Sequence, residues 1–554
     1  MQHIELKYLL LIALQFLVVA LLCRAEAQTE IHVPQTVAFP DLYEVSIAEL
    51  QDGLQNRHFT GVDLVKAYFA RIEEVNLRGP TLRAIIETNP NALAQAAVLD
   101  NERILKGPRS PLHGIPILVK DTIATMHSEG MNTTAGSFAL LDSVVPRDAG
   151  VVAKLRASGA IILGKASLSE WGEYRGKNVP SGFSARGGQS SSPYVPLGDP
   201  SGSSSGSGIA TAIGLAAGSL GSETDGSIIL PCNNNNLVGI KPTVGLTSRA
   251  GVIPISVHQD SVGPMCRSVA DAAAILTVIA GKDPLDDYTL VQPPTVPDYS
   301  KALNKTALKG ARLGVPRALF ARENQNIVAA FNASLETIHQ LGATIVDPAE
   351  FPDTAELEAS NNETVVMLAD LKVDLATYIA GLVEVPTGVK TLADLIAFNV
   401  AHADEELVPP FWTDQSIFIA SENTTQDQAY FDALAADKDL GQTRGIDATL
   451  KKFNLDAIII PSYVASGPAA IAGYPVITVP LGFQPTSVAL SPAEPIRTMG
   501  PNMPFGIAFV GTAFSEFQLI SFAFAYEQAT HNRLKQLAYT AAIPNTQLKD
   551  VVGH

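Results

Sequence analysis

Apolar positions along this chain follow two different spacings. The first is helical, because apolar residues recur every three or four positions and share one helix face, as at Leu64, Val65, Tyr68, Phe69 and Ile72. The second is a short, almost continuous apolar run, which predicts a strand buried between helix layers, as at 115–119, 161–163, 457–460 and 476–479. The two spacings alternate along the chain, which predicts an α/β fold.

Two other segments carry local signals. Ser268 and Asp271 have the spacing of a capping box at a helix start, and Gly281 is typical of that helix's end. Residues 187–207 are rich in Gly, Ser and Pro, a composition shared with flexible linkers. Because apolar sequence follows this stretch at once, we expect a loop that packs into the core.

The chain is long and apolar enough to bury a large core, with 554 residues, of which 46% are hydrophobic and 17% charged. No internal repeat is evident. We expect residues 28–554 to form one large α/β/α domain, with a central mixed β-sheet covered by helices. Residues 284–439 are more acidic and less regular, and we expect them to form a variable insertion or cap over the sheet.

The N-terminus has the pattern of a secretory signal peptide. Lys7 precedes an apolar run that ends near Cys23. Ala25-Glu26-Ala27 follows with the small-x-small pattern of a cleavage site. The run of about 16 residues is shorter than the roughly 20 that a membrane-spanning helix needs. We expect residues 1–27 to be removed, leaving a secreted protein with no stable membrane association.

Glycosylation sequons fit this expectation. Together with the leader, five N-x-S/T patterns predict a glycoprotein, and they are at Asn132, Asn304, Asn332, Asn362 and Asn423. We expect Asn132 to be unmodified, because it lies near the predicted chemistry. Only Cys232 and Cys266 follow the leader. They could form one bridge, but two separate buried thiols are favoured.

Charge and motifs narrow the function classes. The net charge of −17 argues against nucleic-acid binding and against docking on anionic lipid. No phosphate-binding glycine loop precedes a lysine, and neither H-E-x-x-H nor C-x-x-C occurs. We therefore expect no cofactor and no metal. The oligomeric state is not predicted.

The candidate chemistry lies in two serine-bearing loops. Residues 201–207 read SGSSSGS and residues 221–227 read GSETDGS, with an apolar stretch between them. Lys120 ends the strand-like run 115–119. A buried lysine beside serines can activate a hydroxyl nucleophile without histidine. The combination predicts a hydrolase that cleaves acyl bonds.

Each loop could supply the nucleophile. Residues 202–206 match G-x-S-x-G, the nucleophile elbow of α/β-hydrolases, with Ser204 at its tip. That elbow requires a preceding strand, and the prolines at 193, 196 and 200 make a central strand unfavourable there. The second loop follows an apolar run, and its small residues allow successive backbone N–H groups to converge on an oxyanion. An ordinary turn has the same composition.

With these two loops, the chain resembles the amidase signature family. Its first loop resembles G-G-S-S-G-G-S, its second resembles G-T-D-x-G-G-S-I, and Ser203 and Ser227 are 24 positions apart, as in the family. Further matches follow in the family's order, at 114–121, 239–243, 251–254, 263–265, 472–475 and 504–506. The likeness extends over about residues 50–533 and is weakest in 284–439.

The resemblance implies a Ser–Ser–Lys triad. Ser227 is then the nucleophile, Ser203 is the bridging serine, whose peptide bond is typically cis in the family, and Lys120 is the terminal base. Apolar surroundings lower the pKa of a lysine from about 10.4 and leave part of it as neutral amine. The resemblance also implies an oxyanion hole formed by the backbone N–H groups of Thr224, Asp225, Gly226 and Ser227.

This sequence departs from the common family pattern at three positions. Glu223 replaces the usual Asp, Asp225 replaces a glycine, and Ile229 stands where many relatives, including tRNA-dependent amidotransferase subunits, have arginine. The S-E-T-D-G-S-I form resembles bacterial peptide amidases and secreted or fungal amidases. Without the arginine, we expect an uncharged or apolar acyl group near Ile229.

Four functions are compatible with these motifs. The best supported is a secreted amidase that hydrolyses a small-molecule or peptide amide to carboxylate plus ammonia or amine. An amidotransferase A-type subunit is disfavoured by the leader and the acidic charge. A non-catalytic binding protein is disfavoured because Lys120, Ser203 and Ser227 are all present. Esterase activity with the same triad remains open, and the sequence does not name the acyl group.

Overall fold

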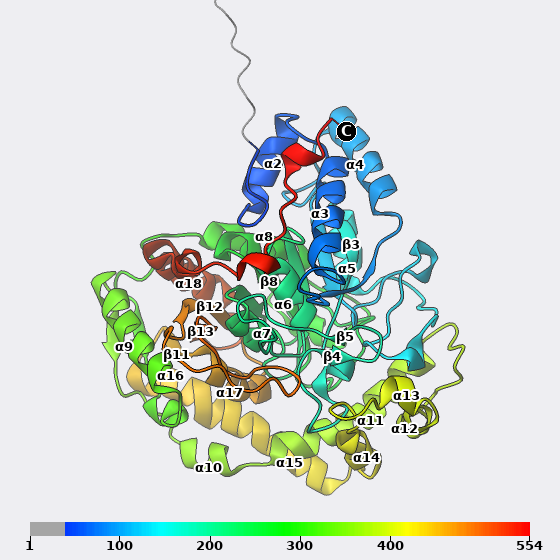
Figure 1. Cartoon of the computed structure of the whole chain (residues 1–554). Helices are drawn as coiled ribbons and strands as arrows, with labels where there is room; N and C mark the ends of the chain where they lie inside the picture. Colours follow the sequence, from blue (N-terminus) through cyan, green and yellow to red (C-terminus); the bar gives the residue numbers. More distant parts are fainter. Residues whose placement is uncertain (1–38, 554) are drawn as a thin grey trace, which may run out of the picture. The chain divides into compact units, whose positions relative to one another are not determined.

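An eleven-stranded mixed sheet is the framework of residues 39–553, the part of the chain that this computed structural model describes (Figure 1). The predicted signal peptide, residues 1–27, lies outside the described residues. The strand order is β1-β3-β2-β6-β8-β7-β12-β13-β11-β9-β10. The pairs β3–β2, β2–β6, β11–β9 and β9–β10 are parallel, and the other pairs are antiparallel.

Most strands coincide with the apolar runs of the sequence. Their bounds are β1 Ile85–Thr88, β2 Pro116–Lys120, β3 Ile161–Ala166, β6 Gly218–Glu223, β7 Val238–Lys241, β8 Ser261–Cys266, β9 Arg312–Gly314, β10 Thr344–Val346, β11 Ala457–Pro461, β12 Val476–Phe483 and β13 Pro504–Val510. A separate two-stranded sheet contains β4 Phe183–Ser184 and β5 Gly188–Gln189. Every residue of β2, β3 and β8 is buried, as strands enclosed on both faces require. The four predicted strands are confirmed as β2, β3, β11 and β12.

Helices cover this sheet. Their bounds are α2 Ile47–Gln55, α3 Gly61–Val75, α4 Ala92–Lys106, α5 Gly150–Ala157, α6 Ser205–Ala212, α7 Ile229–Asn234, α8 Val269–Ile279, α9 Gln325–Gln340, α10 Thr354–Ala359, α11 Asn362–Ala380, α12 Leu392–Ala401, α13 Ala403–Glu406, α14 Ser416–Glu422, α15 Gln428–Lys438, α16 Asp447–Phe453, α17 Ser466–Ala472 and α18 Glu516–Thr530. Helix α8 contacts α5, α18 and strands β7 and β8, whereas α6 and α7 contact each other and strands β6, β7, β12 and β13. The predicted mixed sheet covered by helices is confirmed.

Helix starts follow their local chemistry. Thr60 caps α3, and the side chain of Asp63 accepts a hydrogen bond from the backbone N–H of Thr60 in return. At α8 the predicted capping box is half correct. Ser268 accepts from the backbone N–H of Asp271, but the Asp271 carboxylate accepts from Ile47 at 2.9 Å instead of closing the box. That carboxylate therefore binds a segment distant in sequence, which local spacing cannot reveal.

The segment 284–439 is more regular than its sequence suggests. It contains the long helices α9, α11 and α15, and it contributes β9 and β10 to one edge of the main sheet. Its weak apolar periodicity therefore does not mean that regular elements are missing. Its interpretation as a variable insertion or cap stays a prediction.

The two ends of the described chain are bonded to each other. Gln547 accepts a hydrogen bond from the N–H of Leu42 at 2.9 Å and donates to Asp41 at 2.7 Å. Fully buried Arg71 of α3 donates to the carbonyl oxygens of Gly214 and Thr546, both at 2.7 Å. Residues near the C-terminus therefore complete the bonding of an internal arginine.

Cys232 and Cys266 are buried free thiols, as favoured by the sequence, and burial raises the pKa of each thiol well above its ordinary value. Among the described residues, none of the helices has the length and apolarity needed to cross a membrane.

Candidate active site

Strand β2 delivers Lys120 into the interior. The strand lies between β3 and β6, parallel to both, and Lys120 is its last residue and only 1% exposed. Its Nζ donates hydrogen bonds to Ser203 Oγ at 2.7 Å and to the carbonyl oxygen of Ser222 at 2.9 Å. One buried amine thus contacts both serine-bearing loops.

Burial changes the protonation of Lys120. Desolvation lowers its pKa to about 7, and the carboxyls of Asp260, Glu173 and Glu223 oppose this shift more weakly. With a pKa near 7, roughly half of the lysine is neutral at neutral pH. Such an amine can accept a proton, which an ordinary surface lysine cannot do.

Ser203 is distinguished from the other serines of the first loop. The peptide bond between Gly202 and Ser203 is cis, as the resemblance implied, and α6 begins just beyond. The loop is buried, as predicted. Three other hydroxyls of this loop donate to backbone carbonyls: Ser204 to Ser222, Ser205 to Ser201 and Ser207 to Leu220. Ser204, the tip of the alternative elbow, is therefore a fully buried structural residue.

Gly202 is the position of the first loop with least room. A Cβ atom there would lie 1.8 Å from Glu173 Oε2 and 2.2 Å from Ser169 Oγ. Glu173 is itself bonded to Ser181 at 2.6 Å and to Ser169 at 3.1 Å, so it cannot easily move away. The absence of a side chain at Gly202 lets the backbone of the loop approach these groups.

The second loop turns between β6 and α7 and is held by two carboxylates. Glu223 Oε2 accepts from the N–H groups of Ile228 at 2.6 Å and Ile229 at 2.9 Å. Thr224 Oγ1 donates to Asp260 Oδ1 at 2.5 Å. The change from Asp to Glu at 223 therefore leaves a carboxylate that closes the turn.

Ser227 lies at the end of this turn and is 7% exposed. Its carbonyl oxygen accepts from the N–H of Ser204 at 3.1 Å, which joins the two loops directly. The N–H groups of Asp225, Gly226 and Ser227 have no hydrogen-bond partner among the described residues. Three such unpaired N–H groups on one tight turn can receive an oxyanion.

Asp225 does not present an ordinary exposed carboxylate beside Ser227. Burial raises its pKa, and a hydrogen bond with Ser466 and the charge of Lys241 oppose that rise. Ile229 is fully buried. The apolar surface near the serines comes instead from a small cavity lined by Ser203, Thr224 and Asp260 together with Trp171, Ile253 and Ile255.

The structure therefore brings Lys120 and Ser203 into direct contact, and it attaches Ser227 to them through the backbone of Ser204. Sequence reasoning missed Glu173 and Asp260. Asp260 follows Thr224 by 36 positions, and Glu173 precedes Gly202 by 29, so no local spacing connects them. Burial raises the pKa of Asp260 to about 6.

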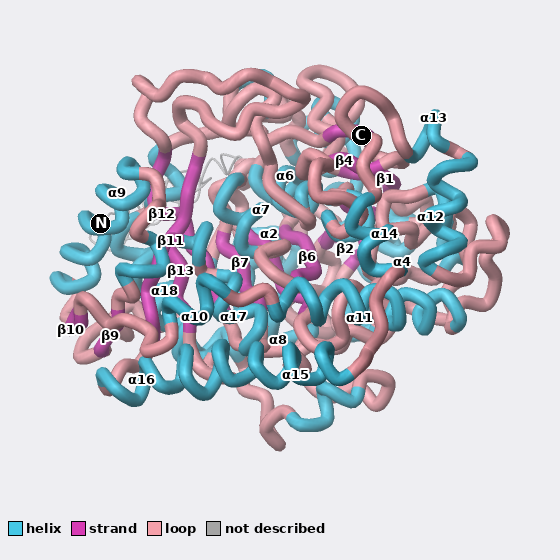
Figure 2. Tube along the Cα trace, turned by 90° about the horizontal axis from the view of Figure 1, so that it is seen from below, coloured by secondary structure: helices cyan, strands magenta, loops and turns pink. Residues whose placement is uncertain are grey.

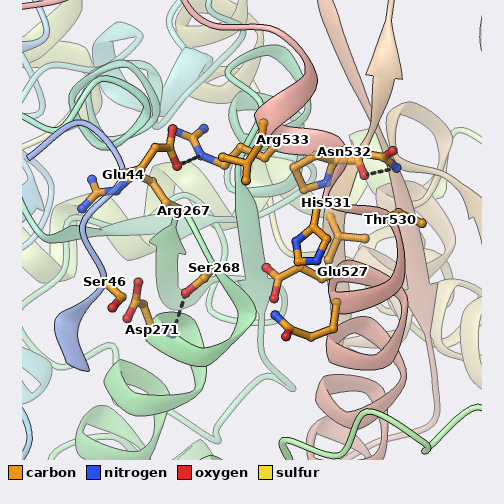
Figure 3. A pocket seen from close by; sticks show the side chains of 14 residues that line it. Glu44, Ser46, Arg267, Ser268, Asp271, Glu527, Thr530, His531, Asn532 and Arg533 are labelled. Atoms are coloured by element: carbon orange, nitrogen blue, oxygen red, sulfur yellow. Dashed lines mark hydrogen bonds and ion pairs between the residues drawn. The ribbon is translucent and has the colours of Figure 1, made fainter. Parts of the chain in front are cut away.

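Another cavity lies where α8 and α18 meet and contains none of the predicted site residues (Figure 3). Arg533 pairs with Glu44 at 2.9 Å in its wall. Arg267 donates to the backbone carbonyls of Val45 and Thr211. These arginines hold distant chain segments together.

The family of this chain follows from its similarity to known proteins. The family model named Amidase matches residues 63–520. The chain belongs to the amidase family. This amidase is 42% identical over 518 residues to a protein of Arabidopsis thaliana named as a probable amidase, covering 92% of the chain and 94% of that protein.

Solved structures agree with this assignment. The native peptide amidase of Stenotrophomonas maltophilia superposes on this amidase with a TM-score of 0.80 and 39% sequence identity, covering 90% of this chain and 98% of that one.

A more distant relative by sequence is the A-type subunit of a glutamyl-tRNA(Gln) amidotransferase from Geobacter metallireducens, which is 32% identical, covering 88% of this chain and 98% of that protein. The protein is an amide-hydrolysing enzyme.

Proposed function

We propose that the protein is a secreted amidase that cleaves a carboxylic amide through Ser227, Ser203 and Lys120. The observation that carries this proposal is the 2.7 Å hydrogen bond between Lys120 Nζ and Ser203 Oγ, made by a buried lysine with a pKa near 7. Secretion is supported by the sequence of residues 1–27. The peptide amidase neighbour supports a peptide or small-molecule amide as substrate.

Acylation begins with two proton transfers. Neutral Lys120 takes a proton from Ser203 Oγ as Ser203 takes one from Ser227 Oγ, which attacks the carbonyl carbon of the amide. The carbonyl oxygen becomes an oxyanion, and the N–H groups of Thr224, Asp225, Gly226 and Ser227 bind it. The carbon–nitrogen bond then breaks, and the proton held by Lys120 returns through Ser203 to the leaving nitrogen.

Deacylation uses the same groups in reverse. A water molecule gives a proton to the Ser203–Lys120 pair and attacks the ester carbonyl of the acyl-enzyme. The second tetrahedral intermediate releases the carboxylate and restores the Ser227 hydroxyl. An ester substrate would enter the same cycle with an alcohol as leaving group, so esterase activity is an alternative that shares every residue.

An amidotransferase subunit is the second candidate, favoured by the 32% identical relative. The net charge of −17 opposes docking of tRNA. A hydrolase releases ammonia from a free amide without any partner protein. Ammonia release by the purified chain alone therefore separates the two functions.

A fluorophosphonate probe tests the nucleophile. The probe reacts with activated serine hydroxyls, so we expect one adduct, located on Ser227 by mass spectrometry of peptides. Ser227→Ala should lose both the adduct and amide turnover. An adduct on Ser204, or no adduct on either loop, would refute the proposed triad.

A further inference from the structure

A cavity opens beside the second loop, on the side formed by the helices of segment 354–472. Helix α17 supplies Gly467, Pro468 and Ile471. Its first residue, Ser466, packs against the loop, because a Cβ atom built at Gly226 would lie 3.3 Å from Ser466 Oγ. Helix α11 supplies Glu363 and α15 supplies Asp437. Helix α15 contacts both α11 and α17, and Figure 2 shows the three close together.

The wall of this cavity combines two carboxylates with apolar side chains. Asp437 is 4% exposed, and its Oδ2 has no hydrogen-bond partner among the described residues. Such an unpaired buried carboxylate oxygen is costly unless a cationic group binds it. The apolar part of the wall comprises Leu319, Leu357, Val464, Pro468 and Ile471.

Within the described chain, no basic residue forms an ion pair with these carboxylates. None of the nine residues that line this cavity is lysine or arginine, and neither Glu363 nor Asp437 forms an ion pair in the described chain. Lys438, the next residue after Asp437, is exposed and lines a neighbouring cavity that shares Asp437. The described residues contain no group of three or more His, Cys, Asp or Glu side chains that could hold a metal ion.

One of these carboxylates, Glu363, is also connected to the nucleophile loop. Burial raises the pKa of Glu363, and the charge of the Asp225 carboxyl raises it further. Glu363 Oε1 also accepts from Gln259 Nε2 at 2.7 Å, and the next residue, Asp260, holds Thr224. The cavity therefore lies next to residues that contact the loop carrying Ser227.

We propose that this cavity binds a protonated amine or guanidinium of the substrate, so that the preferred amides carry a long cationic side chain. The inference rests on the proposed function and adds a substrate class to it. The methylene stem contacts the apolar wall, as the stems of lysine and arginine do on protein surfaces. The charged end lies between Glu363 and Asp437, where it provides the missing partner for Asp437 Oδ2.

Two nearly isosteric substrates test this inference. N-acetyl-lysine amide and N-acetyl-norleucine amide have similar chain lengths but differ in charge, and N-acetyl-glutamate amide adds an anionic side chain. We expect the ratio of kcat/KM for the lysine amide to that for the norleucine amide to be at least about 10. The glutamate amide should be the poorest substrate, and salt should reduce the ratio.

Substitutions then locate the effect. Asp437→Asn and Glu363→Gln should each lower the lysine-to-norleucine ratio about fivefold or more, because each removes a carboxyl group that can ionise to pair with a bound cation and keeps the side-chain shape. The ratio compares two substrates on one preparation, so partial loss of folded enzyme does not change it. Asp432→Asn is the matched control, since Asp432 is an exposed carboxylate on the same helix, and its ratio should equal that of wild type.

Contrary outcomes are distinct from failure of the proposed function. A ratio near 1 in wild type, a ratio unaffected by both substitutions, or a preference for the glutamate amide would overturn the cationic subsite while leaving amide hydrolysis intact. Absence of ammonia release from every amide, together with absence of an adduct on Ser227, would overturn both.

Discussion

At the scale of single residues, the site depends on how burial sets protonation. Lys120 is a cation in water, but enclosure by β2 and both loops lowers its pKa to about 7, so the neutral base exists without any neighbouring histidine. Asp225 shows the same effect with opposite sign, because burial raises the pKa of its carboxyl. The family resemblance implied the lysine and both serines as the candidate triad. The local sequence did not predict Glu173 or Asp260, because their partners are 29 and 36 positions away.

The pH dependence of turnover follows from Lys120. The base must be neutral, and its pKa in the folded enzyme is about 7, so kcat/KM should rise with pH and reach half its maximum near pH 7. A pH–rate profile for a neutral amide measures this. Lys120→Arg should be inactive at every pH, because a guanidinium stays protonated. Half-maximal kcat/KM above about pH 9 would contradict the depressed pKa of Lys120, because an ordinary lysine titrates near 10.4.

Stability should respond to the same residue with a defined sign. The folded pKa of Lys120 is depressed, so the unfolded chain binds more protons and wild-type stability falls as pH drops from about 10 to 7. Lys120→Met removes the titrating amine and keeps the volume. Its melting temperature should exceed that of wild type, by a margin that widens between pH 10 and 7. A margin independent of pH would contradict the depressed pKa.

At the scale of elements, the second loop is a strand-to-helix turn whose shape is fixed by carboxylates. Glu223 ends β6 and accepts from the first N–H groups of α7, and Asp260, the residue just before β8, holds Thr224. The strands around this turn were predictable, because continuous apolar runs fix buried strands. The turn was predictable only as a composition of small residues. Its closure depends on side chains that the tertiary structure brings to it.

Glu223 is therefore a positioning residue. Glu223→Ala should lower kcat about 100-fold, because the N–H groups that receive the oxyanion lose their fixed direction. Glu223→Gln should restore activity to within about fivefold of wild type, since the amide oxygen still accepts both bonds. Steady-state kinetics of both variants check this.

The control for Glu223 is a carboxylate that serves a surface helix. Glu49 accepts from the N–H of Ser46 at the start of α2. Glu49→Ala should lower the melting temperature and leave kcat unchanged. If Glu223→Gln were as inactive as Glu223→Ala, the effect would not come from the acceptor role.

At the scale of the whole molecule, the sequence predicted the α/β class and the mixed sheet, but not the edge of that sheet. Strands β9 and β10 are only three residues long, and they lie in a segment whose sequence is more acidic and less regular than the rest. Such short strands carry little periodicity, so the pairing of β9 with β11 and of β10 with β9 is a property of the assembled sheet. Secretion belongs to this scale too and stays a proposal.

Passage through a secretory pathway should remove the leader and add glycans at exposed sequons. Asn304, Asn332 and Asn423 are exposed, whereas Asn132 donates its amide to Glu87 at 2.9 Å. Expressed in a eukaryotic secretory host, the protein should begin at Gln28 and carry glycans at the exposed sequons, with Asn132 unmodified. N-terminal sequencing and mass spectrometry after enzymatic deglycosylation measure both. An intact leader, or a glycan on Asn132, would contradict the proposal.

The hydrogen bonds between Gln547 and residues 41 and 42 have a practical consequence for proteolysis. A carboxypeptidase digests a chain from its C-terminal end, and hydrogen bonds that hold Gln547 oppose removal of the residues around it. Trimming past Thr546 would also leave the guanidinium of Arg71 short of an acceptor in the interior. The hydrogen bonds of Gln547 to Asp41 and Leu42 thus help to keep the acceptor of an internal charge in place when proteases are present.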